Sequence, residues 1–112
     1  MTLHGPSFEL SKNPDKLVFL LHGYGDNGEN FIPLAKSLYD SESNINFYAP
    51  NAPSPVPQFP TGRQWFELYP NGINFNEAGP KEKELLKQDC IASLKLIQNY
   101  ISNLCLKYNL SL

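Results

Sequence analysis

A short apolar run that ends in a glycine-containing turn constrains the fold of this chain more than any other feature. The run covers residues 17–21 and leads directly into His22, Gly23, Tyr24 and Gly25. Apolar runs of this length without polar alternation are typical of strands that are buried on both faces of a parallel sheet. The sequence therefore predicts a strand over residues 16–22 that other elements cover on both faces.

Helix and strand patterns alternate after this turn. Apolar residues at helical spacing predict a helix over residues 28–40, in which Pro33 is tolerated only in the first turn. A second apolar segment predicts a strand over residues 45–49. Strand, helix and strand within about 35 residues fit a right-handed βαβ unit. With 112 residues, the chain has room for one domain of the α/β class.

Prolines crowd the segment that follows the second predicted strand. They lie at positions 50, 53, 55, 57 and 60. Because proline lacks an amide hydrogen and fixes its φ angle, this segment can be neither a central strand nor the interior of a helix. We expect residues 50–64 to form a stiff, proline-rich loop, which is a candidate wall for a pocket.

The last predicted element is a long helix over residues 80–108. Pro80 suits its first position, and an apolar stripe extends from Leu86 to Tyr108. Cys90 and Cys105 both lie in this predicted helix. Their separation along a straight helix, about 22 Å, is too long for a disulfide, so we expect both thiols to be reduced.

Charge and hydropathy exclude several functional classes. The net charge of −2 and the pI near 5.6 provide no basic surface for nucleic acid. No apolar run approaches the roughly 20 residues that span a bilayer, and the N-terminus lacks the pattern of a signal peptide. We therefore expect a cytoplasmic protein without a membrane span. The two histidines and the absence of paired ligand spacings predict that there is no metal site.

Three motifs together resemble those of one enzyme family. The first extends from Leu20 to Asn27 and is similar to the family pattern L-H-G-x-G-D. The second is the strand and proline segment from Phe47 to Pro53, and the third is the aromatic pair Trp65-Phe66. From about Lys16 to its last residue, the chain resembles the carboxylesterase, phospholipase and acyl-protein thioesterase group of α/β-hydrolases. The resemblance implies the N-terminal part of a doubly wound, mainly parallel sheet, which is incomplete in these residues.

The resemblance also implies candidate site residues. In α/β-hydrolases one amide of the oxyanion hole comes from the loop after this strand, which implies the Tyr24 N–H in the loop of residues 22–25. The alternative for this loop is an ordinary strand-to-helix turn. Trp65 and Phe66 are implied to bind substrate in the acyl pocket, and the alternative for Trp65 is an ordinary core tryptophan. The implied reaction is hydrolysis of an ester or thioester substrate through an acyl-serine, without a cofactor.

The catalytic residues of such an enzyme are not found in the chain. Its nucleophile lies in a G-x-S-x-G turn, and no serine has this context, since Ser7 has only the first glycine. His22 is implied to shape the loop, and His4 belongs to a segment expected to be mobile, so neither is favoured as a proton shuttle. Because nucleophile, acid and base follow the oxyanion loop in this fold, we expect residues 1–112 to hold none of the triad and to be inactive alone.

Three functional hypotheses are open at this point. The first is an N-terminal fragment of a carboxylesterase-like serine hydrolase, produced from an interrupted gene. The second is half of a split hydrolase, completed by a second polypeptide that carries the C-terminal half and pairs with the open edge of the sheet. The third is a non-catalytic module that binds a hydrophobic ligand with the proline-rich segment and Trp65.

Overall fold

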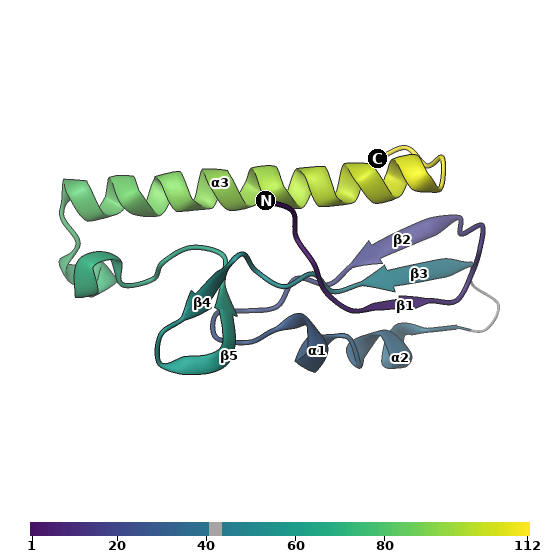
Figure 1. Cartoon of the computed structure of the whole chain (residues 1–112), viewed down its shortest axis with the longest axis horizontal. Helices are drawn as coiled ribbons and strands as arrows, with labels where there is room; N and C mark the ends of the chain where they lie inside the picture. The colour runs from purple at the N-terminus through teal and green to yellow at the C-terminus, as the bar shows by residue number, and fades with distance from the viewer. Residues whose placement is uncertain (41–43) are drawn as a thin grey trace.

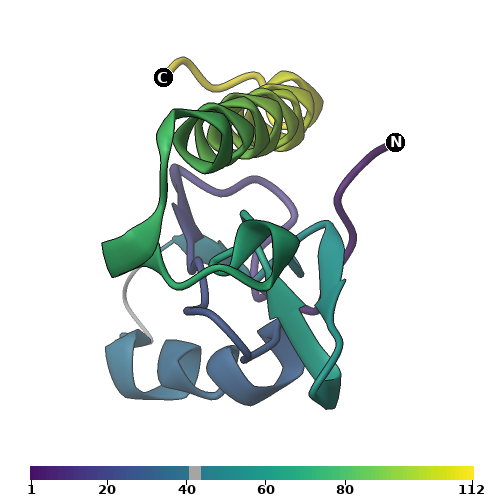
Figure 2. The same ribbon diagram turned by 90° about the vertical axis from the view of Figure 1, so that its left-hand side faces the viewer.

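Helices cover both faces of a three-stranded sheet in this protein. The computed structural model describes residues 1–40 and 44–112. The strand order is β1-β3-β2, with β1 at Ser7–Glu9, β2 at Lys16–Phe19 and β3 at Ile45–Tyr48. The short helices α1 (Gly28–Phe31) and α2 (Leu34–Leu38) lie on one face, and the long helix α3 (Pro80–Lys107) lies on the other (Figure 1). Figure 2 shows the same layers end-on, and this layering confirms the predicted α/β class.

The two predicted strands pair in parallel, and side chains from the sheet form the core. Val18 of β2 is in register with Phe47 of β3. The buried cluster on the α1–α2 side consists of Leu20, Ala35, Phe47 and Ala49. On the opposite face, the Phe19 ring stacks 5.7 Å from that of Tyr48 and meets Tyr100 of α3 edge-on at 6.0 Å. Alternate residues of each strand therefore point to opposite faces of the sheet and pack against the helices there.

The expected helix over residues 28–40 is in fact two short helices. α1 ends at Phe31, α2 begins at Leu34, and Pro33 occupies the N-cap position of α2. Proline removes one helical hydrogen bond, and its ring collides with the carbonyl group four residues earlier. Because α1 already begins at Gly28, Pro33 falls beyond its first turn, and the helix has to restart there.

The expected loop over residues 50–64 contains a two-stranded hairpin, so the prediction was wrong for most of this segment. β4 (Ser54–Val56) pairs antiparallel with β5 (Phe59–Gln64), and Pro55 lies opposite Arg63. In a two-stranded sheet both strands are edges, where the missing proline N–H can face away from the partner. The prolines therefore exclude a central strand, as expected, but they permit this hairpin.

The long helix α3 matches its prediction to within one residue. Pro80 occupies the first turn, and the helix ends at Lys107. Asn109 has a φ of 58°, and Leu110 N–H donates to Cys105 O at 2.8 Å, which together form a Schellman-type C-cap. Cys90 and Cys105 are free thiols, as expected. Among the described residues, no helix combines the length and the apolarity needed to cross a membrane.

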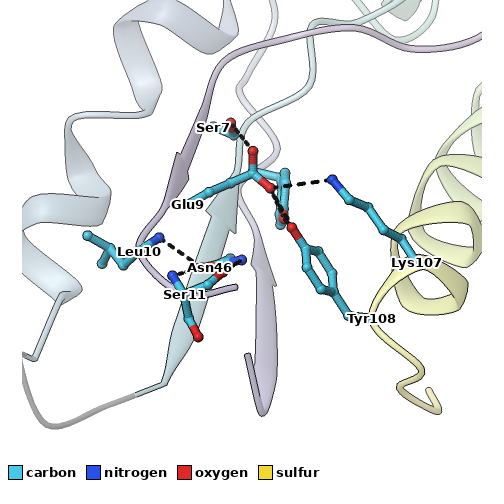
Figure 3. A network of polar contacts seen from close by, with 8 residues as sticks. Ser7, Glu9, Leu10, Ser11, Asn46, Lys107 and Tyr108 are labelled. Carbon is cyan, nitrogen blue, oxygen red and sulfur yellow. Dashed lines mark hydrogen bonds and ion pairs between the residues drawn. The ribbon is translucent and has the colours of Figure 1, made fainter. Parts of the chain in front are cut away.

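The N-terminal strand β1 was not predicted from the sequence. Its Glu9 side chain connects the sheet with the C-terminal end of α3. The Glu9 carboxylate accepts hydrogen bonds from Tyr48 Oη at 2.8 Å and from Tyr108 Oη at 2.7 Å. Lys107 Nζ lies 3.9 Å from the same carboxylate (Figure 3). The hydrogen bond from Tyr108, followed by that from Tyr48, lowers the pKa of Glu9 below its ordinary value of 4.5.

The residues before β1 are also held in place, although the sequence favoured a mobile segment. Leu3 is buried, Asn51 N–H donates to His4 O at 2.8 Å, and Ala49 N–H donates to Pro6 O at 3.0 Å. These bonds extend the pairing of β1 beyond the end of β3. The N-terminal segment therefore supports the chain just after β3, which borders the candidate site.

Candidate functional site

The glycine-containing loop leaves the sheet at the C-terminal end of β2. Leu20 N–H donates to Tyr48 O at 2.8 Å, which is the last sheet contact before the loop. Gly25 has a φ of 80°, in the left-handed region that favours glycine. Asp26 N–H donates back to Gly23 O at 3.2 Å and closes the turn. The loop therefore has a defined geometry that depends on Gly25.

The hairpin strand β5 holds the far side of this loop. Gly25 N–H donates to Arg63 O at 2.9 Å, and Arg63 N–H donates to Asp26 O at 2.8 Å, so the two segments form an isolated antiparallel bridge. A Cβ atom on Gly62 would lie 2.7 Å from Gly25 O. Close approach of the two backbones thus requires glycine at position 62.

His22 is a buried member of the loop with both ring nitrogens engaged. Its exposed fraction is 3%. Ala52 N–H donates to Nε2 at 3.0 Å, so Nδ1 carries the proton and donates to Gly23 O at 2.7 Å. The Trp65 indole N–H donates to His22 O at 2.8 Å, and the two rings lie 5.2 Å apart. This arrangement suits a residue that shapes the loop, because neither nitrogen is available for proton transfer.

The Tyr24 amide has no hydrogen-bond partner among the described residues. In residues 1–40 and 44–112, Tyr24 N–H donates no hydrogen bond, whereas Gly25 and Asp26 N–H are both paired. The Tyr24 side chain is 40% exposed. An unpaired N–H in a loop that is held in place at the end of a parallel strand can bind an anionic oxygen.

Polar contacts after Tyr24 fix the start of α1. Asn27 is the N-cap, and its side chain accepts from Asn30 N–H at 2.8 Å. The Asp26 carboxylate accepts from Asn27 N–H at 2.9 Å and from the Asn30 amide at 3.1 Å. The backbone hydrogen bond from Asn27, followed by the side-chain hydrogen bond from Asn30, lowers the pKa of Asp26. The loop is therefore anchored at both of its ends.

Trp65, the first residue of the aromatic pair, contacts both the loop and α3. Trp65 and Phe66 are both half-buried. The Trp65 carbonyl accepts a short hydrogen bond from Ser93 Oγ of α3, while its indole contacts His22. Within the described ranges, no ring contact or hydrogen bond joins Phe66 to the loop. Trp65 thus contacts the loop through a hydrogen bond and a ring contact, and Phe66 forms neither among the described residues.

Sequence reasoning did not identify Arg63 or Ala52 as members of the site. Arg63 contributes through its backbone and side chain, and Ala52 through its peptide group. One signal was available for Arg63, because it is the chain's single arginine and the single charged residue in positions 43–66. Ala52 lies in the motif from Phe47 to Pro53, but nothing in that motif indicated a role for its peptide group. Among the described residues, no group of three His, Cys, Asp or Glu side chains forms a possible metal site.

The fold and the loop place the protein in a known structural class. A parallel strand that ends in a glycine-containing turn, in a sheet covered on both faces, is the arrangement of the α/β-hydrolases. The structure is similar to the crystal structure of esterase PE8, with a TM-score of 0.75 and 26% identity. That similarity covers 99% of this chain and 48% of the esterase.

The chain belongs to the phospholipase/carboxylesterase family, whose model matches residues 8–109. It is 43% identical over 37 residues to acyl-protein thioesterase 1 from two strains of Cryptococcus neoformans var. neoformans serotype D. The matched segment is 33% of this chain and 16% of the thioesterase. The chain thus spans about half of the esterase and a smaller part of the thioesterase, and it is a member of a hydrolase family.

Proposed function

We propose that this chain supplies the oxyanion loop of a serine hydrolase that acts on carboxylic esters or thioesters. The observation that carries the proposal is the unpaired Tyr24 N–H, followed by the paired amides of Gly25 and Asp26. A donor that is fixed in advance stabilises an oxyanion more than the neutral carbonyl of the substrate, because no reorganisation is needed when charge develops. One such donor typically contributes about 2.7–4 kcal/mol to transition-state stabilisation.

In the proposed reaction, a serine outside this loop attacks the carbonyl carbon, and its proton passes to a general base. The carbonyl oxygen becomes an oxyanion and accepts a hydrogen bond from Tyr24 N–H. The base returns the proton to the leaving alcohol or thiol, and water then hydrolyses the acyl-serine. The 112 residues contain no G-x-S-x-G segment. We therefore propose that nucleophile, acid and base come from sequence outside these 112 residues.

The free edge of β2 offers a place for that sequence. In the described sheet β2 pairs with β3 on one side only, so its other edge presents unpaired N–H and C=O groups. Leu21, two residues after the end of β2, is 43% exposed. A strand added at this edge would end beside the loop. We propose that the strand leading into the nucleophile turn pairs here.

A second candidate function is binding of a hydrophobic ligand without turnover. It is favoured by exposed aromatic rings that border the loop: Tyr24 is 40% exposed, and Phe59, 3.9 Å from the Cβ position of Gly25, is 54% exposed. With half-buried Trp65 and Phe66, these rings are candidate contacts for an acyl chain. Titration with decanoate, followed by Trp65 fluorescence, tests this function. Saturable binding without ester turnover would support it, and a flat titration would remove it.

The catalytic proposal is tested first by an assay of residues 1–112 with p-nitrophenyl acetate and butyrate. No turnover above buffer is expected, because a single hydrogen-bond donor cannot replace a nucleophile. Turnover that disappears when one of the chain's own serines is replaced by alanine would overturn the proposal.

The second test restores the proposed remainder of the enzyme. The chain is co-expressed with the polypeptide encoded beyond the codon for Leu112, and ester turnover is measured. Tyr24→Pro, which removes the N–H, is expected to lower kcat about 10²–10³-fold with little change in KM. Tyr24→Ala keeps the N–H and is the matched control. If neither that polypeptide nor a co-purifying one carries G-x-S-x-G, the proposal fails.

A further inference from the structure

Arg63 forms hydrogen bonds with the oxyanion loop and with the segment that follows β3. Its backbone accepts from Gly25 N–H at 2.9 Å and donates to Asp26 O at 2.8 Å. Its guanidinium donates from Nε to Ala52 O at 2.9 Å and from Nη2 to Pro53 O at 2.8 Å. One residue thereby connects the loop with the chain that follows β3.

His22 adds a further hydrogen bond that connects the loop with the segment bound by Arg63. Ala52 N–H donates to His22 Nε2 at 3.0 Å, while Ala52 O accepts from Arg63. The peptide groups around Ala52 are therefore held from both sides, by the first residue of the turn and by the strand that binds Gly25. Ala52 is 1% exposed, so its polar groups depend on these protein partners rather than on water.

The composition of the proline-rich segment explains why an arginine is needed here. Each proline contributes a carbonyl acceptor but no N–H donor, so this segment has an excess of acceptors. The guanidinium has five N–H donors in a rigid plane and satisfies two successive carbonyls at once. The same residue uses its backbone to pair with the loop, which fixes the distance between the two segments.

We propose that Arg63 is a positioning residue that fixes the direction of the Tyr24 amide. The guanidinium anchors β5 to the carbonyls of Ala52 and Pro53, and β5 in turn binds Gly25 and Asp26. The Tyr24 N–H belongs to the peptide whose carbonyl, Gly23 O, accepts from Asp26 N–H and from the His22 ring. Because β5 holds Gly25 and Asp26 in place, this peptide keeps its orientation. That this role assists catalysis rests on the proposed function, whereas the positioning of the loop by Arg63 does not.

The test measures amide hydrogen exchange by NMR in the ¹⁵N-labelled chain. Arg63→Met, which keeps the apolar part of the side chain, is compared with Arg63→Lys and with the control Lys36→Met, which removes a cation from α2. In Arg63→Met we expect Gly25 N–H to exchange at least about tenfold faster and Tyr24 N–H to change its chemical shift. Leu20 N–H, which donates to Tyr48 O in the sheet, should keep its protection within about twofold. Arg63→Lys should lie between, and Lys36→Met should match the wild type.

Two results would overturn the proposal. One is unchanged Gly25 protection in folded Arg63→Met, which would show that the loop holds its geometry without the guanidinium. The other is an equal loss of protection at Gly25 and Leu20, which would show that Arg63 supports the whole fold and not the loop. If Arg63→Met fails to fold, the same comparison in Arg63→Lys decides. Because these readings require no turnover, they are independent of the esterase assays that decide the proposed function.

Discussion

Replacement of His22 by phenylalanine tests how much the buried ring contributes to the loop. The change keeps an aromatic ring beside Trp65 but removes both ring nitrogens. Ala52 N–H then loses its acceptor in a site where Ala52 is 1% exposed, and an unsatisfied buried donor costs about 1–3 kcal/mol. Loss of the bond to Gly23 O adds about 1 kcal/mol. We therefore expect the free energy of unfolding to fall by about 2–4 kcal/mol.

The assay is unfolding in urea, monitored by far-UV circular dichroism. Fluorescence is less suitable, because the substitution lies next to the single tryptophan and would change its signal directly. His22→Gln is the matched control, because its side-chain oxygen can reach the position of Nε2 and accept from Ala52. Its expected loss is about 1 kcal/mol. Equal stability of His22→Phe and the wild type within about 0.5 kcal/mol would refute the reasoning that these two hydrogen bonds hold the loop.

Three further changes test the surrounding fold. Glu9→Gln should lower the free energy of unfolding at pH 7, and much less near pH 3. The folded protein lowers the pKa of Glu9, so the carboxylate stabilises the fold above the ordinary value of 4.5, and this stabilisation is lost as pH falls through the folded pKa. An equal difference in urea midpoint at both pH values would contradict this. Asn46→Ala should cost about 2–4 kcal/mol in urea unfolding, because Asn46 is 0% exposed and its side chain bonds Leu10 N–H, Ser11 N–H and Ser11 O; no loss would contradict it. Phe47→Ala should cost about 3–5 kcal/mol by the same assay and Phe59→Ala, at an exposed ring, under about 0.5, so similar losses would argue against the assigned core.

Local patterns in the sequence were sufficient for the α/β class, the parallel pair and the long helix. An apolar run before a glycine turn, and an apolar stripe behind Pro80, each express a preference within one continuous segment. The motif from Leu20 to Asn27 similarly marked the loop of the candidate site, and the family match over residues 8–109 agrees with it. These features depend on the order of neighbouring residues, which the sequence contains directly.

Several features that define the site depend on contacts between distant segments. β1 exists because it pairs with β3, and the prolines of β4 and β5 are compatible with strands only because both are edges. The support of the loop by Arg63 and Ala52 joins residues that lie 30 or more positions from their partners in the turn. The sequence alone determined that a glycine-containing loop follows β2. Only the tertiary structure decided how this loop is held, because Gly25 N–H and Asp26 O pair with the backbone of Arg63, which lies in the hairpin far along the chain.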